Sequence, residues 1–328
     1  MDAKLLTLNN NFRLPGLEFT RGAGGFTRAL IDTPVASGEL YLHGAHVTRY
    51  QPPGHAPVLW MSDNSYFERG KPIRGGVPIC VPWFGPNAKD SQAPAHGLAR
   101  TKAWDVMASG RTADGGVSLE LSTIVDGFLL HYHVQFGRSL QLELGVELAA
   151  QSPFSDSPSP PTPLPEDGER GTGGLVGGDA LESGASSRTR KFEEALHTYL
   201  AVGDIRQVSM EGLEAYSFLD KVGGVEKQPA AHEAIRFTQE TDRVYLKTNT
   251  VCTLRDPVLK RTITVHQSNS RSTIVWNPWI DKSARMADFG NDEWPGMLCI
   301  ETANVGDHAI AIEPGELHTM VARIEVAP

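Results

Sequence analysis

A carboxylate and a histidine from distant parts of the chain have the residue types needed for proton transfer. Glu301 follows the apolar run 297–300, and a carboxylate at the end of a buried strand is costly unless it is paired or functional. Burial should raise the pKa of this carboxyl, as a general base requires. His197 lies in FEEALHTYLAVGD, where strand alternation places it on one face with Ala195 and Tyr199. The structural alternatives are a salt-bridged glutamate and a hydrogen-bonded core histidine.

Two arginines flank a loop-like segment that could bind an anion. Residues 71–100 read KPIRGGVPICVPWFGPNAKDSQAPAHGLAR, which five prolines interrupt. Arg74 precedes two glycines, which allow close approach of the backbone to a ligand, and its guanidinium offers a planar fork to an oxyanion. Trp83 and Phe84 could line a site, or they could pin the loop to the core. A surface salt bridge is the alternative for either Arg74 or Arg100.

The composition excludes several classes of protein. The 30 Lys and Arg against 39 Asp and Glu give a net charge of −9, so a nucleic-acid partner is not expected and an anionic ligand must meet a local basic cluster. No apolar run approaches the roughly 18 residues of a membrane span, and the first twenty residues contain no apolar signal region. Cys80, Cys252 and Cys299 form no CxxC pair, which favours a reducing, cytoplasmic location.

Short runs rich in Val, Ile, Thr and aromatic residues, bounded by turn residues, predict an all-β fold. The chain lacks an alternating strand–helix pattern, which disfavours a parallel α/β sheet and favours large antiparallel sheets packed as a sandwich. One short helix is expected, over residues 281–289. The expected strands lie at 39–51, 117–125, 129–136, 140–148, 191–200, 244–246, 258–266, 272–276, 308–312 and 317–326.

One segment differs from the rest of the chain. Residues 152–187 contain 6 Pro, 7 Gly and 7 Ser, and such a stretch cannot bury enough apolar area to offset an ordering cost of about 1–2 kcal/mol per residue. We therefore expect a single domain over 1–328 that a disordered insertion interrupts, and we expect its deletion to leave folding and turnover intact. An ordered loop and a linker between two domains are the alternatives.

Several of these segments together resemble one family. KPIRGGVPICVPWFG, AHGLARTKAWDV, FEEALHTYLAVGDI, SFLDKV and VWNPWIDKSARMADFGNDEWPGMLCIETANV are similar, in this order, to segments of the hexose-6-phosphate mutarotases (glucose-6-phosphate 1-epimerases), a branch of the aldose 1-epimerase superfamily. The resemblance spans nearly all of the chain outside 152–187. It implies a galactose-mutarotase-like β-supersandwich and an isomerase that interconverts the α and β anomers of an aldohexose 6-phosphate.

The resemblance also implies roles for single residues. The histidine of ALHTY, His197, is implied as the general acid, and the glutamate of LCIET, Glu301, as the general base. Because these roles reverse on ring closure, a histidine with a pKa near 7 suits the task. Where some relatives have a substrate-binding glutamine before HGLAR, this chain has Ala95. The implied substrate contacts are Arg74, His96, Arg100 and Asp220.

The expected partner is a small-molecule hexose phosphate, and the chain is expected to act as a monomer. Arg74 and Arg100 are the candidates to hold the phosphate. Neither a metal nor a redox cofactor is expected, because the proton transfers of mutarotation require neither. The paired histidines at 43/46 and 131/133 also have no evident third ligand for a metal ion. Two alternatives stay open, a mutarotase for unphosphorylated aldoses and a non-catalytic sugar-phosphate-binding protein. A pure binding protein would not need the matched acid and base at His197 and Glu301.

Overall fold

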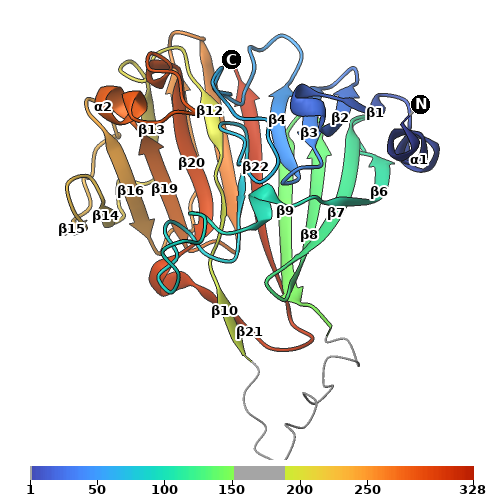
Figure 1. Ribbon diagram of the computed structural model, residues 1–328. Helices are drawn as coiled ribbons and strands as arrows, with labels where there is room; N and C mark the ends of the chain where they lie inside the picture. The colour runs from blue at the N-terminus through green and yellow to red at the C-terminus, as the bar shows by residue number, and fades with distance from the viewer. Residues whose placement is uncertain (1, 151–188) are drawn as a thin grey trace, which may run out of the picture.

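The computed structural model describes residues 2–150 and 189–328, and the insertion predicted at 152–187 lies outside them. Two eight-stranded antiparallel sheets form most of the fold (Figure 1). The prediction of an all-β fold with large antiparallel sheets is confirmed, whereas the single-domain organisation stays a prediction. Within the described part of the chain, no helix has the length and apolar character needed to cross a membrane.

The first large sheet carries the segments expected to do chemistry. Its strands follow the order β15-β14-β16-β19-β20-β11-β5, and β12 pairs with β20 beyond the end of β11. All eight residues of β20 are buried, so a polar side chain on this strand has lost its contact with water. The strand bounds are β5 Ile79–Cys80, β11 Glu194–Leu196, β12 Tyr199–Ala201, β14 Phe218–Asp220, β15 Glu226–Gln228, β16 Thr241–Leu246, β19 Ser272–Asn277 and β20 Met297–Asn304.

The second large sheet shows a regular alternation of buried and more exposed residues. Along β8, the apolar side chains at 128, 130, 132, 134 and 136 are buried, and the residues between them are partly or fully exposed, as expected for a strand with one face on the core. A hairpin turn at 137–139 joins β8 to β9. In sheet order, the strands are β13 Ser209–Glu211, β17 Cys252–Asp256, β18 Arg261–Ser268, β22 Leu317–Ala327, β9 Leu140–Leu148, β8 Phe128–Phe136, β7 Val117–Val125 and β6 Asp105–Arg111.

Smaller elements complete the fold. A four-stranded sheet is formed by β1 Leu17–Arg21, β2 Thr27–Asp32, β3 Ser37–Tyr41 and β4 His46–Gln51, and β10 Arg190–Phe192 pairs with β21 Ile310–Ile312. The helices are α1 Ala3–Phe12 and α2 Trp279–Ala284, with 3₁₀ turns at Ala23–Gly25, Ala99–Thr101, Trp294–Gly296 and Gly306–His308.

Four expectations about elements are wrong. The single strand expected over 39–51 is two strands, because Gly44 and Ala45 adopt positive φ between them, and the strand expected over 191–200 is the three short strands β10, β11 and β12. Helix α1 was not expected; the side chain of Asp2 caps its first turn. The expected 281–289 helix is displaced and shorter, since α2 ends at Ala284.

Candidate active site

His197 and Glu301 face each other across neighbouring strands. β11 pairs with β20 so that Leu196 lies opposite Thr302, and β12 resumes the same register, with Tyr199 opposite Cys299. The intervening residue His197 therefore lies opposite Glu301. Their side chains meet, with 3.3 Å between His197 Nε2 and Glu301 Oε1, and both residues are buried. The proton-transfer pair expected from the sequence is thus brought together by β-sheet register.

Burial shifts the pKa values of the two groups in opposite directions. Loss of solvation raises the pKa of Glu301 well above its ordinary value, and the nearby carboxylate of Asp242 adds to this rise. Loss of solvation lowers the pKa of His197 well below its ordinary value, with smaller contributions from His96 and Arg74. The expected rise for the carboxyl is confirmed. The expected histidine pKa near 7 is not confirmed, because burial disfavours the imidazolium and lowers the pKa.

Each member of the pair keeps one polar atom free for a ligand. Among the described residues, Glu301 Oε2 and His197 Nδ1 are buried without a hydrogen-bond partner, an arrangement that costs free energy in a folded protein. The imidazole is held in place by aromatic contacts. Its ring stacks on Tyr199 at 4.8 Å between centroids and 13° between planes, and it meets the edge of Trp276 at 6.2 Å.

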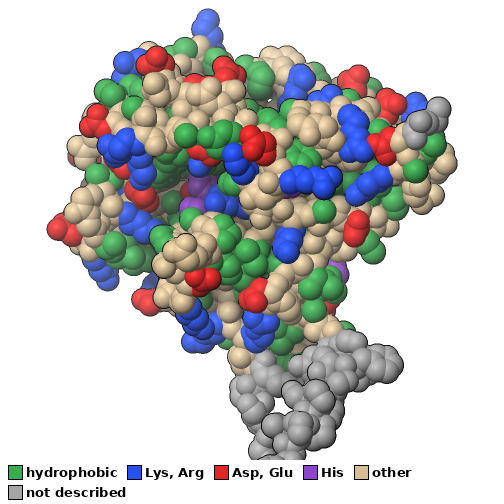
Figure 2. Space-filling model, in the orientation of Figure 1, with side chains coloured by type: hydrophobic (Ala, Val, Ile, Leu, Met, Phe, Trp, Pro, Cys, Tyr) green, Lys and Arg blue, Asp and Glu red, His purple; other side chains and the backbone are tan. Residues whose placement is uncertain are grey.

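A cavity of about 340 Å³ opens over this pair. Figure 2 shows a hollow in the surface where histidine side chains are visible between blue Lys and Arg side chains. The residues that line the cavity come from the segment 74–100, from the junction of β11 and β12, from the end of β14, from strands β16, β19 and β20, and from α2 and the turn that follows it. They are Arg74, Phe84, Gly85, Pro86, Ala95, His96, Arg100, His197, Lys221, Asp242, Ile274, Trp276, Lys282, Met286 and Glu301.

Arg74 lines the cavity and forms an ion pair with Asp288. Its Nε and Nη2 donate to the carboxylate of Asp288, at 3.1 and 2.9 Å to Oδ2, and its Nη1 donates to Tyr199 Oη at 2.9 Å. Gly75 and Gly76 follow it with positive φ, and a side chain at either glycine would meet backbone atoms within 2.6 Å. The RGG sequence therefore allows the tight loop that carries the guanidinium into the site.

Arg100 and His96 enter from the other end of the same loop. Arg100 donates from Nη2 to the carbonyl of Ala95 at 2.7 Å and has no carboxylate partner among the described residues. The backbone N–H of Gly85 donates to His96 Nδ1 at 3.3 Å. Burial lowers the pKa of His96 to about 3, so the ring is neutral and presents Nε2 as a donor.

Asp220 is the one predicted contact that the structure leaves outside the residues lining the cavity. On β14 it lies opposite Arg243 of β16, with 3.8 Å between Arg243 Nε and Asp220 Oδ2. Strand alternation sends this pair to one face of the sheet and the next pair, Lys221 and Asp242, to the other. Lys221 and Asp242 line the cavity. Asp220 therefore faces away from the cavity, and the next residue, Lys221, faces into it.

Comparison with known proteins agrees with this geometry. The sequence matches the family model for aldose 1-epimerase over residues 30–154 and 182–325. The chain belongs to the aldose 1-epimerase family. The match leaves out 155–181, which fall within the predicted insertion, and it covers the residues of the cavity. The chain is therefore an isomerase, and an apposed acid and base are what epimerisation by proton transfer requires.

Relatives of this epimerase have names that specify the substrate more closely than the family name does. A protein of Escherichia coli K12 named "Putative glucose-6-phosphate 1-epimerase" is 31% identical over 282 residues, 84% of this chain and 82% of that protein. A Salmonella typhimurium LT2 protein of the same name is 30% identical over 301 residues, 90% of this chain and 91% of that one.

Solved structures show that the fold is shared as well. The crystal structure of a "putative mutarotase" from Salmonella typhimurium aligns with a TM-score of 0.79 at 27% identity, covering 97% of this chain and 95% of that one. A galactose mutarotase-like protein from Clostridium acetobutylicum aligns at 0.61 with 12% identity, covering 97% and 99%. The expected galactose-mutarotase-like β-supersandwich is confirmed.

Three charged residues that line the cavity of the epimerase were missed by sequence reasoning. Asp242 and Lys221 were missed because their strands are short, and alternation within LDKV and TDRVY is the signal that could have found them. Lys282 lies in α2 and contacts Glu240 at 3.0 Å and Asp242 at 3.4 Å. The signal that could have found Lys282 is its spacing from Met286, because two residues four positions apart in the expected helix lie on the same face.

The sequence left open whether Trp83 and Phe84 line the site or pin the loop to the core, and the structure gives each residue a different role. Phe84 lines the cavity of the epimerase and meets the His96 ring edge-on at 4.6 Å between centroids. Trp83 instead pins the loop, because its Nε1 donates to the carbonyl of Pro94 at 3.0 Å. One aromatic side chain is thus available for contact with a ligand, and the other holds the loop that carries it.

The donor set of the site does not suit a metal ion. Ligand atoms of His197, Cys299 and Glu301 lie within 4.8 Å of one another. Burial and the Glu301 carboxylate raise the pKa of the Cys299 thiol well above its ordinary value, whereas a cysteine ligand has to be a thiolate. His43 and His46 are bonded to the backbone carbonyls of Lys71 and Gly75. The arrangement of His197 and Glu301 suits proton transfer better than metal binding.

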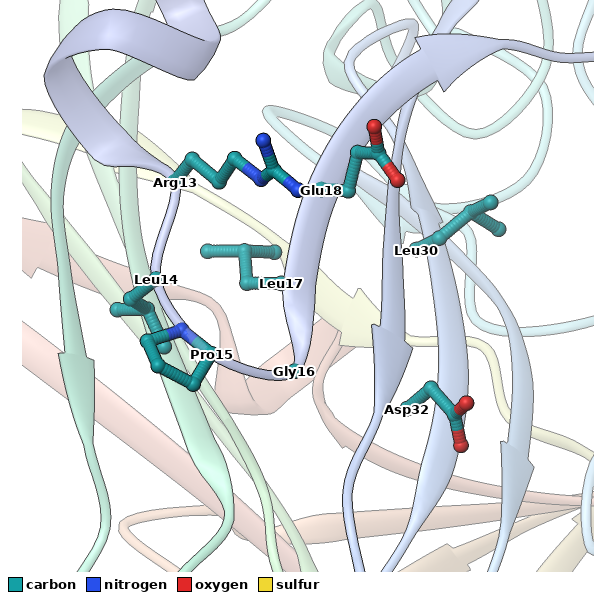
Figure 3. A pocket seen from close by; sticks show the side chains of 8 residues that line it. All are labelled: Arg13, Leu14, Pro15, Gly16, Leu17, Glu18, Leu30 and Asp32. Atoms are coloured by element: carbon teal, nitrogen blue, oxygen red, sulfur yellow. The ribbon is translucent and has the colours of Figure 1, made fainter.

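A larger hollow, of about 680 Å³, lies where α1 meets β1 (Figure 3). Arg13, Glu18 and Asp32 line it together with aliphatic residues and glycine. The residues that line it include no histidine, and they bring no acid and base into contact. Size therefore does not decide which hollow is the active site of this epimerase.

Proposed function

We propose that the chain catalyses the interconversion of the α and β anomers of aldohexose 6-phosphates, with glucose 6-phosphate as its substrate. The observation that carries the proposal is the 3.3 Å contact between His197 and Glu301 on the floor of a sugar-sized, cation-lined cavity. The names of the relatives support the choice of a phosphorylated substrate.

Ring opening needs one proton removed and one added. Glu301 accepts the proton of the C1 hydroxyl while His197 gives a proton to the ring oxygen. The C1–O5 bond breaks, C1 becomes an aldehyde carbon, and O5 becomes a hydroxyl. The open chain rotates about C1–C2 and closes on the other face of the carbonyl. On closure His197 takes the proton back from O5 and Glu301 returns its proton to the former carbonyl oxygen, so that no proton is gained or lost.

The shifted pKa values explain how the pair starts this cycle. With the carboxyl pKa raised and the imidazole pKa lowered, burial favours the neutral forms of both groups, a carboxyl that keeps its proton and an imidazole that lacks a second one. The reactive state, with a carboxylate and an imidazolium, has the same number of protons and forms by transfer across the 3.3 Å contact. A sugar hydroxyl and a ring oxygen favour this transfer because they hydrogen-bond to the charged forms. Each positioned proton transfer contributes about 10²- to 10⁴-fold to the rate.

The phosphate takes no part in bond making. Four cationic side chains line the cavity, Arg74, Arg100, Lys221 and Lys282, and they suit an anionic group even though the whole chain has a net charge of −9. Binding energy at the phosphate positions C1 and O5 against the acid and base, and in this way energy from a non-reacting group is used for catalysis. Phe84 and Trp276 offer apolar faces to the C–H face of a pyranose.

The test is exchange NMR between the two anomers of glucose 6-phosphate with and without the protein, with glucose measured in parallel. We expect strong acceleration for glucose 6-phosphate and much weaker acceleration for glucose at equal concentration. Equal rates for both sugars would support a mutarotase for unphosphorylated aldoses instead. No acceleration of either sugar by folded protein would contradict the proposal.

A further inference from the structure

Tyr199 is joined both to the loop that carries Arg74 and to the catalytic histidine. Its backbone N–H donates to the carbonyl of Gly76 at 2.9 Å, and its Oη accepts from Arg74 Nη1 at 2.9 Å. Its ring stacks on the imidazole of His197, with 4.8 Å between centroids and 13° between planes. Tyr199 is 1% exposed and is not among the described residues that line the cavity. It can therefore act on the reaction only through the residues that it contacts.

The ring of Tyr199 is placed to favour the charged form of the imidazole. Ring opening requires an imidazolium, although burial lowers the pKa of His197. A cation over the face of an aromatic ring, within about 6 Å of its centroid, is attracted by the negative charge of that face, and more strongly away from water. The rings of His96 and Trp276 meet the imidazole edge-on at 74° and 75°, and Phe84 is tilted by 31° at 6.4 Å. Tyr199 lies closer to the imidazole and more nearly parallel to it than these three rings.

The hydroxyl of Tyr199 orients Arg74 and does not transfer a proton. Burial raises the pKa of Tyr199, so the phenol keeps its proton and is not a candidate acid or base. The phenol oxygen and the Asp288 carboxylate are the two acceptors that hold the guanidinium of Arg74. Trp60 stacks on Tyr199 at 5.6 Å between centroids and contacts Phe289, the neighbour of Asp288, at 4.8 Å. One aromatic cluster therefore keeps both acceptors in place.

We propose that Tyr199 is a positioning residue with two separable roles: its ring stabilises the imidazolium of His197 during ring opening, and its hydroxyl orients Arg74 toward the substrate. This inference rests on the proposed function and adds to it a residue that touches neither the sugar nor the transferred protons. The imidazolium acts while the C1–O5 bond breaks, so losing the negative face of the ring lowers kcat. Arg74 contacts the substrate in the ground state and in the transition state alike, so losing the hydroxyl raises KM.

Tyr199→Phe tests the role of the hydroxyl, because it keeps the ring. The KM for the sugar should rise about 3- to 10-fold, with kcat changed by less than about 3-fold, since one hydrogen bond to a charged group is lost. Tyr50→Phe is the matched control. Tyr50 of β4 is fully buried outside the cavity, and its Oη donates to the carbonyl of Gly137 at 3.1 Å. That variant also loses a buried hydroxyl bond, but its KM and kcat should stay as in the wild type.

The role of the ring is tested with a trifluorinated phenylalanine incorporated in place of Tyr199. This residue keeps the shape of phenylalanine, while its fluorine atoms withdraw electron density from the face of the ring. Compared with Tyr199→Phe, kcat should fall about 3-fold or more at the same KM, because the attraction for the imidazolium is weakened. The same residue in place of Tyr132 is the control, since Tyr132 is buried on β8 against Trp104, at 6.1 Å between centroids, and kcat should not change there. Circular dichroism checks the fold of each variant.

The outcomes separate the two roles from each other and from the proposed function. Equal kcat values for phenylalanine and its fluorinated form at position 199 would overturn the role of the ring, and an unchanged KM in Tyr199→Phe would overturn the role of the hydroxyl. The series is measured with glucose 6-phosphate and with glucose. If the wild type exchanges the anomers of glucose alone, the proposed substrate is wrong, and the same pattern of kcat and KM with glucose still supports the roles of Tyr199. If it exchanges neither sugar, both proposals are overturned.

Discussion

His197 lies directly opposite Glu301 in the register that joins β11 and β12 to β20. The acid and the base, 104 positions apart in the sequence, are thus held by backbone hydrogen bonds on both sides of the contact. The aromatic rings of Tyr199 and Trp276 then fix the imidazole. A site built on strands in this way is positioned by the backbone, which favours catalysis by preorganised groups.

Because the two residues act on one substrate as a unit, their losses should not add. We expect Glu301→Gln and His197→Asn each to lower kcat for anomer exchange by about 10²-fold or more, with the fold retained. The double variant should be little slower than the slower single variant. Exchange NMR measures all three, and circular dichroism checks the fold. Multiplied losses in the double variant would show that the two groups act independently.

The pH profile should be broad. The imidazole of His197 gains a second proton only as the pH falls through its lowered pKa, and the carboxyl of Glu301 loses its proton only as the pH rises through its raised pKa. We therefore expect the acidic limb of kcat/KM to lie below 6.5, the ordinary value of a histidine, and the limb at higher pH to lie above 4.5, the ordinary value of a glutamate. Glucose is measured in parallel, because a phosphate monoester itself titrates near pH 6. A steep change centred on 4.5, the ordinary value of a glutamate, would contradict the pairing.

The buried carboxyl should make the protein less stable as the pH rises. Above pH 4.5 an unfolded glutamate has lost its proton whereas folded Glu301 keeps one, so the folded state binds more protons and the free energy of unfolding falls with pH. Glu301→Gln removes this dependence. The variant should match the wild type near pH 4 and exceed it in Tm by a margin that widens toward neutral and alkaline pH. A constant difference in Tm at all pH values would argue against a raised pKa.

A second buried carboxylate ties the catalytic sheet to the other sheet. Glu194 Oε1 accepts from Asn304 of β20 and from His318 Nε2 of β22, each at 2.8 Å, and Glu194 is fully buried. Glu194→Leu should lower the free energy of unfolding by about 3–5 kcal/mol, because it breaks a buried pair and leaves its partners unsatisfied. Glu226→Leu, on exposed β15, should change it by less than about 0.5 kcal/mol. Urea unfolding compares the two.

Long alternating strands could be predicted from the sequence, and short ones could not. Strands β7, β8 and β9 have nine residues each, and buried residues recur at every second position over most of their length, which is enough to identify them within a residue. Strand β14 has three residues, too few for a period, so the side that Asp220 faces depends on its pairing with β16. Helix α1 depends on a local cap at Asp2, a signal that carries little weight in a short polar segment.

In the candidate site too, some features could be predicted from the sequence and others could not. His197 and Glu301 could be predicted from their chemistry and from the resemblance, and Arg74, His96 and Arg100 reach the cavity as expected. Whether a charge is free or already matched could not be predicted, because Asp288 meets Arg74 through tertiary contacts between residues 214 positions apart. The lowered pKa of His197 likewise comes from burial, which the sequence of its strand does not specify.

The most direct test of the account is the rate of anomer exchange of glucose 6-phosphate measured by NMR with wild-type protein and with Glu301→Gln at equal concentrations. The account predicts a large acceleration by the wild type and, for a variant that is folded and still binds the sugar phosphate, a rate at least about 10²-fold lower. A folded Glu301→Gln variant that exchanges the anomers as fast as the wild type would contradict the assignment of the base and, with it, the paired acid–base mechanism.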